Sequence, residues 1–197
     1  MTEVKKYEMR KLLKEEILSI YKGVAGEDFP EAELKPVEII ERMLAEDGYA
    51  GLGLFSEEQL IGYALFVKVP GEDVLLLDYY AVLKEFRNGG TGSLFLQKMQ
   101  EIYKDKAAIL LETEEPQKAK NEAEYDIRVR RNGFYERNGA VRTGIKSRLY
   151  IVEFGIFAIP LREKYEDDQI YARLDDIYHY MFGDEGYKKY VRIWKAD

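Results

Sequence analysis

The segment from Arg87 to Ser93 offers the clearest chemistry in this chain. It reads Arg-Asn-Gly-Gly-Thr-Gly-Ser and lies between an apolar run and a helical pattern. Glycines let the backbone turn its N–H groups toward a ligand, and the first turn of a helix leaves N–H groups without partners. The partial positive charge of a helix start attracts anions, and an arginine adds a charged donor. The predicted phosphate or diphosphate site consists of Arg87, Asn88, Gly89, Gly90, Thr91, Gly92 and Ser93.

Two well-known phosphate-binding patterns do not match this loop. A dinucleotide-binding loop needs a third glycine three positions after Gly92, where this chain has Phe95. A P-loop needs Gly-Lys followed by serine or threonine, and that sequence is absent. Neither pattern therefore identifies the phosphate ligand of this loop.

Acidic residues interrupt two apolar stretches and are candidates for proton transfer. Asp78 lies in the run 74–82, where an unpaired carboxylate is costly and needs a reason. Strand alternation would place Leu76, Asp78 and Tyr80 on one face. Glu112 and Glu114 likewise share a face of the next predicted strand. Each acid also fits an ion pair or a contact with a cationic substrate, so the identity of a base stays open.

Hydrophobic periodicity predicts the elements that must hold these residues. Apolar positions at helical spacing mark helices, and short alternating or continuous apolar runs mark strands. The expected helices cover 13–22, 36–46, 91–104 and 118–137, and the expected strands cover 5–10, 49–56, 60–69, 74–82, 107–113, 140–145 and 149–159. This order predicts an α/β protein of mixed α+β type.

Residues 161–197 have a different character. Ile170, Leu174, Ile177 and Met181 form a helical stripe, and six tyrosines and Trp194 lie in this segment. We expect residues 1–160 to form one domain, and residues 161–197 to form a helical, aromatic extension. An apolar helix stripe of this kind usually packs on a core, although a homodimer contact or a wall of the substrate site is the alternative.

Composition narrows the class of protein. The chain has 197 residues, 46% of them hydrophobic, which fits one folded domain and not a disordered chain. It has no cysteine and one histidine, so we expect no disulfide, no thiolate chemistry and no metal site. A net charge of -7 argues against binding to nucleic acid. No signal or membrane-spanning segment is apparent, so we expect a soluble, cytoplasmic protein that does not bind membranes.

The pattern Arg-x-x-Gly-x-Gly, over Arg87, Gly90 and Gly92, resembles the coenzyme A diphosphate loop of the GNAT superfamily of N-acetyltransferases. The sequence Phe-Tyr-Glu-Arg-Asn-Gly at 134–139 resembles a second signature of that family, an aromatic–tyrosine step at a helix end. The element order over 5–159 also agrees with the family, and the tail lies outside the resemblance. The resemblance implies a mixed, mostly antiparallel twisted sheet with helices on both faces, in which two strands part around the cofactor.

The resemblance also implies a reaction. An acetyl group would pass from the cosubstrate acetyl-CoA directly to a primary amine of a small molecule or peptide. The backbone N–H near Val82 would stabilise the thioester oxygen in the tetrahedral state. Tyr135 would donate a proton to the departing thiolate, because a phenol stays protonated at neutral pH. Asp78 and Glu112 are the candidates for the base that takes a proton from the amine.

One position departs from the family pattern. Many relatives have an asparagine seven residues before the motif tyrosine, where this chain has Arg128. Asn121, on a longer helix, is the candidate for that cofactor contact, or the contact is missing. Arg128, Arg130 and Arg131 form a basic run that fits a solvated face, or a contact with the adenosine phosphate or an acidic substrate.

The sequence is also compatible with two functions that are not enzymatic. A GNAT-like domain could bind an acyl-CoA as a sensor without transferring the acyl group, and the aromatic tail could serve a protein–protein interaction. The acceptor amine, the preferred acyl length and the oligomeric state have no readable signature.

Overall fold

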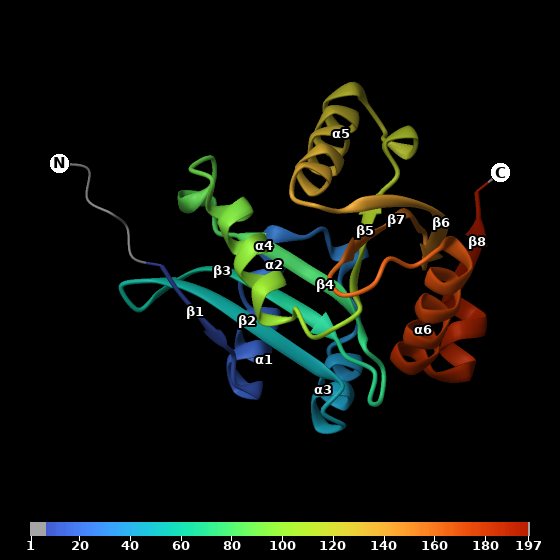
Figure 1. Ribbon diagram of the computed structural model, residues 1–197, viewed down its shortest axis with the longest axis horizontal. Helices are drawn as coiled ribbons and strands as arrows, with labels where there is room; N and C mark the ends of the chain where they lie inside the picture. Colours follow the sequence, from blue (N-terminus) through green and yellow to red (C-terminus); the bar gives the residue numbers. More distant parts are fainter. Residues whose placement is uncertain (1–6, 197) are drawn as a thin grey trace.

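A computed structural model describes residues 7–196 of the chain, and a single twisted sheet organises them (Figure 1). The strands are β1 (Tyr7–Lys11), β2 (Tyr49–Ser56), β3 (Gln59–Val67), β4 (Val74–Val82), β5 (Ala108–Glu114), β6 (Val141–Leu149), β7 (Val152–Pro160) and β8 (Val191–Lys195). Their order in the sheet is β1-β2-β3-β4-β5-β7-β6-β8. Among the strands of residues 7–196, only β4 and β5 pair in parallel, and the other six neighbouring pairs are antiparallel.

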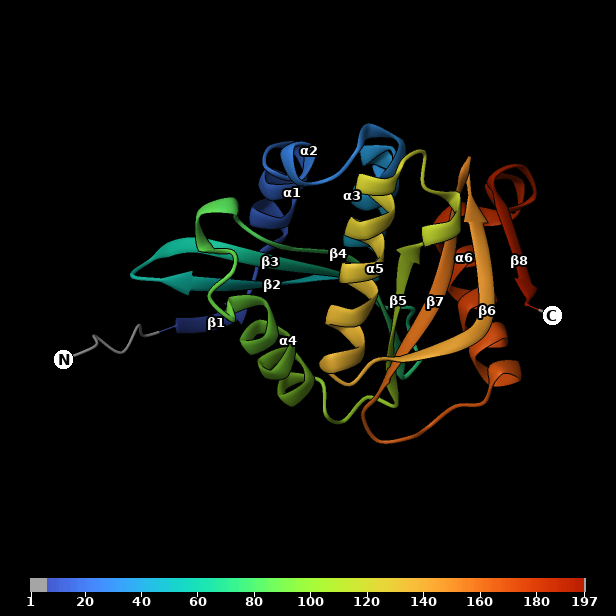
Figure 2. The ribbon, with the colours of Figure 1, turned by 90° about the horizontal axis from the view of Figure 1, so that it is seen from above.

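Helices cover both faces of this sheet. They are α1 (Lys14–Lys22), α2 (Ala25–Asp28), α3 (Val37–Ala45), α4 (Thr91–Ile102), α5 (Glu122–Arg137) and α6 (Asp167–Tyr190), with short 3-10 turns η1 (Glu31–Glu33), η2 (Lys84–Phe86) and η3 (Pro116–Lys118). Buried residues of α1, α3 and α6 share one core with the sheet, and those of α4 and the end of α5 share another. Figure 2 shows α1, α2 and α3 on the side of β2 and β3 opposite to α4. The predicted mixed sheet with helices on both faces is therefore confirmed.

The pairing of β4 with β5 stops halfway along both strands. Backbone pairing runs from Val74 with Ala108 to Leu77 with Leu111. Beyond these positions β4 stays paired with β3, and β5 stays paired with β7. The two strands therefore part, as the family resemblance implies, and each keeps one free edge toward the gap.

A bulge in β4 changes which side chains face the gap. Tyr79 pairs with Leu65 and Leu77 pairs with Phe66, so Asp78 is an extra residue without a partner on β3. The expectation that Leu76, Asp78 and Tyr80 share a face is wrong, because Leu76 packs in the core with α1 and α3 whereas Tyr80 packs against the core with α4. An added residue reverses the alternation of every side chain that follows it.

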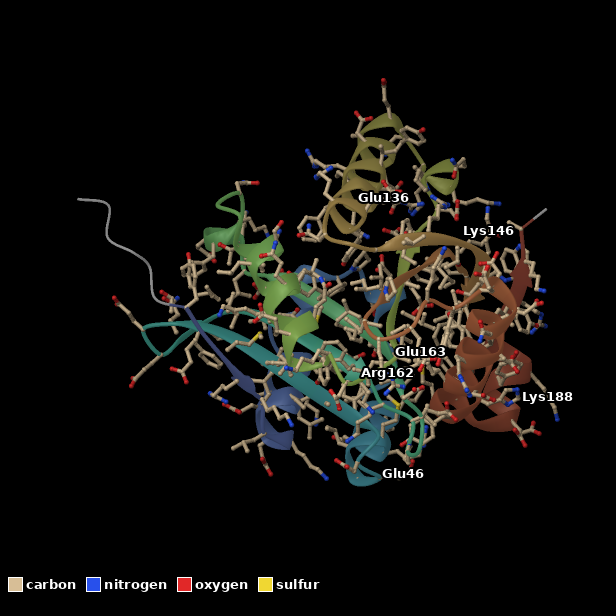
Figure 3. The ribbon with its side chains drawn as sticks, viewed as in Figure 1. Glu46, Glu136, Lys146, Arg162, Glu163 and Lys188 are labelled. Carbon is tan, nitrogen blue, oxygen red and sulfur yellow. The ribbon has the colours of Figure 1, made fainter. Side chains whose placement is uncertain are left out.

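The tail completes the same sheet. The predicted stripe of Ile170, Leu174, Ile177 and Met181 is buried in the core that also contains α1 and α3. The strand β8, which the sequence did not predict, pairs with β6 and forms the edge of the sheet. The link from β7 to α6 is fixed by Arg162, labelled in Figure 3, which bonds Asp73 at 2.7 Å.

Other differences concern the ends of elements. The segment 23–35, expected as a loop, contains α2 and η1. The helix expected over 118–137 begins at Glu122. The turn of the final hairpin lies at 150–151 instead of 146–148, so β6 extends to Leu149 and β7 begins at Val152. Residues 5 and 6 of the first predicted strand, residues 1–6 of the predicted domain and Asp197 of the tail lie outside the described residues. Over residues 7–196, no helix is both long enough and apolar enough to cross a bilayer.

Candidate active site

The glycine loop leads directly into the first turn of α4. Asn88 (φ 66°) and Gly90 (φ 78°) adopt left-handed conformations, and α4 starts at Thr91. The φ of Gly90 explains the glycine at this position, since other residues are strained there. A groove of about 470 Å³ lies beside the loop. Residues from the loop, β4 and α5 line it, namely Tyr80, Val82, Arg87, Asn88, Gly90, Gly92, Ser93, Ile127, Arg130, Arg131, Phe134 and Tyr135.

Gly92 is the point where α4 meets α5. A Cβ atom on Gly92 would lie 3.2 Å from Cζ of Phe134, tighter than most real contacts of a Cβ atom. The hydroxyl of Tyr80 donates to the carbonyl oxygen of Gly92 at 2.6 Å. The second glycine of the motif therefore lets β4, α4 and α5 converge at one end of the groove.

Arg87 is held in place at the mouth of the groove. Its Nε donates to the carbonyl oxygen of Val82 at 2.7 Å, and its Nη2 donates to Oδ1 of Asp28 at 2.7 Å. Its side chain keeps 47% of its surface exposed, and its Nη1 makes no hydrogen bond within residues 7–196. This geometry leaves Arg87 able to donate to an anion at the loop.

A second cavity, of about 260 Å³, lies in the gap between β4 and β5. Its lining residues come from the segment 28–35, from β4 and β5, and from Leu149, Tyr150 and Phe154. They include the carboxylates of Asp78 and Glu112. The residues shared with the groove are Tyr80, Val82, Arg87, Arg131 and Tyr135. The groove and the cavity therefore meet at these shared residues. One ligand in the groove and another in the cavity would both contact them.

Tyr135 lies at that meeting point. Its side chain is only 9% exposed, and its ring lies 5.3 Å from that of Phe134 and 6.4 Å from that of Tyr80. Burial raises the pKa of Tyr135 to about 12, although Arg131 opposes the shift. Its hydroxyl makes no hydrogen bond to a residue in 7–196, so it is a protonated donor without a protein partner.

Asp78 has two protein partners. Nζ of Lys35 lies 2.5 Å from its Oδ1, and the hydroxyl of Tyr49 donates to its Oδ2 at 2.7 Å. The side chains of Lys35 and Asp78 are 6% and 0% exposed. Burial acts to lower the pKa of Lys35, but the attraction of Asp78 and Glu112 outweighs it, so this pKa is raised. The structure thus gives Asp78 the ion pair that was the alternative to a catalytic role.

Glu112 is held by a residue of the tail. The hydroxyl of Tyr178, on α6, donates to Oε1 of Glu112 at 2.5 Å, and Ser147 donates to the same oxygen at 3.4 Å. Burial raises the pKa of Glu112, against the attraction of Lys35. The tail therefore holds a residue that lines the cavity, although no residue of 161–196 lines the cavity itself, as a wall of the substrate site would.

The departure at Arg128 has a structural consequence. Arg128 is buried, and its Nη2 bonds Glu114 at 2.5 Å while its Nη1 donates to the carbonyl oxygen of Glu115 at 2.8 Å. Arg131 bonds the other oxygen of Glu114 at 3.0 Å. The arginine found in place of the family asparagine thus fixes the end of β5 to α5.

The structure does not bring Asn121 to the groove. Its side-chain oxygen accepts a hydrogen bond from the backbone N–H of Glu124 at 2.9 Å, so it caps the N-terminus of α5. The groove contacts α5 from Ile127 onward, and Asn121 is not among its lining residues.

Glu33 is a cavity residue that the sequence reasoning missed. It is half-buried on η1 and lines the cavity. Burial and the negative charge of Glu114 raise the pKa of Glu33 to about 7. The positive charges of Arg131, Arg128 and Lys35 act to lower it but do not outweigh these effects. The spacing of the acidic residues in 23–35 does not indicate which of them lines the cavity. That depends on the path of a short irregular segment, which the sequence does not predict.

Solved structures with the same fold are numerous. A GNAT-family protein from Desulfovibrio desulfuricans is 19% identical with a TM-score of 0.61, over 79% of this chain and 99% of its own. The ribosomal-protein-S18-alanine N-acetyltransferase from Escherichia coli is 18% identical with a TM-score of 0.57, over 82% and 98%. The PaiA N-acetyltransferase from Thermoplasma acidophilum, in complex with coenzyme A, is 17% identical with a TM-score of 0.53, over 81% and 99%.

The sequence comparisons agree with the fold. No curated protein sequence matches the chain. The model of the acetyltransferase (GNAT) family matches residues 13–139, a segment that contains the glycine loop, both parted strands and the motif tyrosine. Because this match covers well over half of the chain, the protein belongs to the acetyltransferase (GNAT) family.

Proposed function

We propose that the protein transfers an acetyl group from acetyl-CoA directly to a primary amine, with Tyr135 as the general acid. The observation that carries this proposal is the meeting of the groove and the cavity at Tyr135, between two parted strands. A thioester that enters along the groove and an amine that enters through the cavity would come together at that residue.

The groove supports the binding of coenzyme A through residues of the glycine loop, β4 and α5. The first turn of α4, with Arg87, Asn88, Gly89, Gly90, Thr91, Gly92 and Ser93, would hold the diphosphate. The free edge of β4, which lines the groove at Tyr80 and Val82, offers backbone donors and acceptors to the amides of the pantetheine arm, as a sheet edge does for a peptide. Arg130, which lines the groove from α5, would contact a phosphate of the adenosine end.

The end of β4 supports stabilisation of the thioester oxygen. The N–H of Leu83 donates to the carbonyl oxygen of Ile61, whereas the carbonyl oxygen of Val82 turns away from β3 to Arg87. In an antiparallel ladder the N–H and C=O of one residue point the same way, so the N–H of Val82 faces the gap. A preset donor there would stabilise the negative oxygen of the tetrahedral state.

Tyr135 then completes the transfer. When the C–S bond breaks, the thiolate of coenzyme A leaves into a site shielded from water and needs a proton. A phenol with a pKa of about 12 is protonated at every physiological pH, so Tyr135 can supply that proton.

The first test separates binding from transfer. Acetyl-CoA should raise the melting temperature of the wild type, and mixing it with a panel of primary amines (benzylamine, a linear diamine and an alanyl dipeptide) should release free coenzyme A. Gly90→Arg should abolish the melting shift, whereas Gly71→Arg, at another glycine with positive φ and open surroundings, should keep it. A shift without release would instead favour an acyl-CoA sensor.

The second test concerns Tyr135. Tyr135→Phe should lower kcat by about 100-fold or more, as is typical for loss of a general acid. Its affinity for acetyl-CoA should change little. Tyr103→Phe, a control with a pKa also raised to about 12 by burial, should keep full turnover. Unchanged turnover in Tyr135→Phe at all pH values would contradict the acid role.

A further inference from the structure

Carboxylates are unusually frequent around the cavity, and most of them already have partners. Within residues 7–196, five carboxylates line it, namely Asp28, Glu33, Asp78, Glu112 and Glu114. Asp78 and Glu112 have the partners described above. Glu114 bonds Arg128 and Arg131, and Asp28 bonds Arg87 and the hydroxyl of Tyr63.

Glu33 differs from the other four. Its carboxylate makes no hydrogen bond and no ion pair with any residue in 7–196, although it lines the cavity. Its backbone is nevertheless fixed, because the hydroxyl of Tyr79 donates to its carbonyl oxygen at 3.0 Å. The N–H of Lys35 donates to the same hydroxyl at 3.2 Å. The result is an unpartnered carboxylate on an anchored turn.

We propose that Glu33 is the general base of the reaction and takes the proton from the ammonium group of the acceptor. This inference rests on the proposed function. An acid already paired with arginine or lysine would lose that attraction on accepting a proton, which disfavours Asp28, Asp78 and Glu114. Glu112 accepts hydrogen bonds on Oε1 from Tyr178 and Ser147, and these bonds favour its ionised form, which makes it a weaker base.

Burial and the charges around Glu33 give it a pKa close to the pH at which a general base would work. Glu114 on β5 repels its negative charge, and Arg131 and Arg128 on α5 and Lys35 after η1 attract it. With partial burial as the largest influence, the pKa of Glu33 is about 7. A base with a pKa near the working pH combines a large ionised fraction with useful basicity.

The protons balance over the whole transfer. Glu33 accepts one proton from the bound ammonium, and the neutral amine attacks the thioester carbon to form the C–N bond. The intermediate then carries a positive nitrogen and a negative oxygen. Its collapse breaks the C–S bond, and the thiolate takes a proton from Tyr135, which regains one from the nitrogen. Glu33 finally releases its proton to water, which leaves an amide and free coenzyme A.

Glu33→Gln tests this role, with Glu31→Gln as the matched control. Glu31 lies on the same 3-10 turn, is exposed and does not line the cavity. With the best amine of the panel at pH 7, Glu33→Gln should lower kcat/KM by roughly 100- to 10,000-fold. It should leave the melting shift with acetyl-CoA unchanged. Glu31→Gln should match the wild type, and Glu33→Asp should recover part of the loss.

The pH profile distinguishes a base from a structural residue. In the wild type, log kcat/KM should rise up to a bend near pH 7 and then level off. In Glu33→Gln it should climb without that bend toward the pKa of the amine, about 10 for an aliphatic amine. A wild-type bend retained in Glu33→Gln, or a loss below threefold, would overturn the role of Glu33 and leave the acetyltransferase function standing. No turnover of any amine by the wild type would overturn both.

Discussion

The buried pair of Lys35 and Asp78 should dominate the stability of the region around the cavity. Replacing Lys35 by methionine keeps much of the side-chain volume but leaves the Asp78 carboxylate, 0% exposed, with only the hydrogen bond from Tyr49. Removing one member of a buried ion pair typically costs about 3–5 kcal/mol. Because small domains are stable by only about 5–15 kcal/mol, we expect Lys35→Met to lose a large share of the free energy of unfolding.

The double variant makes this prediction specific. Lys35→Met combined with Asp78→Asn removes both charges, so its stability should lie within about 2 kcal/mol of the wild type. The two single variants should each lose more than the double variant, which gives a favourable coupling energy of roughly 3 kcal/mol or more. Urea unfolding at pH 8, with the same m-value for all four proteins, measures these differences.

The reasoning would be refuted if Lys35→Met lost less than about 1 kcal/mol, or if the losses of the single variants simply added in the double variant.

Three more predictions follow from single side chains. Tyr178→Phe leaves Glu112 without its 2.5 Å hydrogen bond and should cost roughly 1.5–3 kcal/mol in urea unfolding; a loss below about 0.5 kcal/mol would contradict this. Arg87→Ala should weaken coenzyme A binding about 10- to 100-fold by calorimetry, and an unchanged Kd would argue against its contact with the diphosphate. The pKa of Glu33 rises from 4.5 to about 7 on folding, so the stability that this group contributes is full below pH 4.5 and is lost as the pH passes 7. Glu33→Gln should therefore be more stable than the wild type at pH 9, by ~2 kcal/mol after allowance for solvent screening, with no such gain at pH 4.

The sequence predicted those parts of the fold that depend on local patterns. The glycine loop could be located because phosphate binding at a helix start requires glycines and free N–H groups at fixed spacing. The stripe of Ile170 and its neighbours predicted α6 because its period is helical. Asn121 illustrates the limit, since an asparagine before a helix is as suited to capping as to binding a ligand, and the structure places it at the cap.

What could not be predicted depends on tertiary contacts. The bulge at Asp78 reverses the strand alternation, and its presence follows from the pairing of β4 with β3 rather than from the sequence of β4 alone. The short strand β8 is charged and aromatic, and it becomes a strand because β6 offers an open edge. Glu33 and Lys35 reach the cavity along an irregular path that no periodicity marks.

The position of β8 has a consequence for the synthesis of the protein. Translation delivers β6 and β7 well before residues 191–195, so the backbone groups along the outer edge of β6 stay unpaired while α6 and β8 are still inside the ribosome. An open strand edge of this kind attracts other extended chains. We therefore expect the nascent chain to be prone to aggregation until β8 emerges, and a peptide that mimics β8 to compete with it for β6 during that interval.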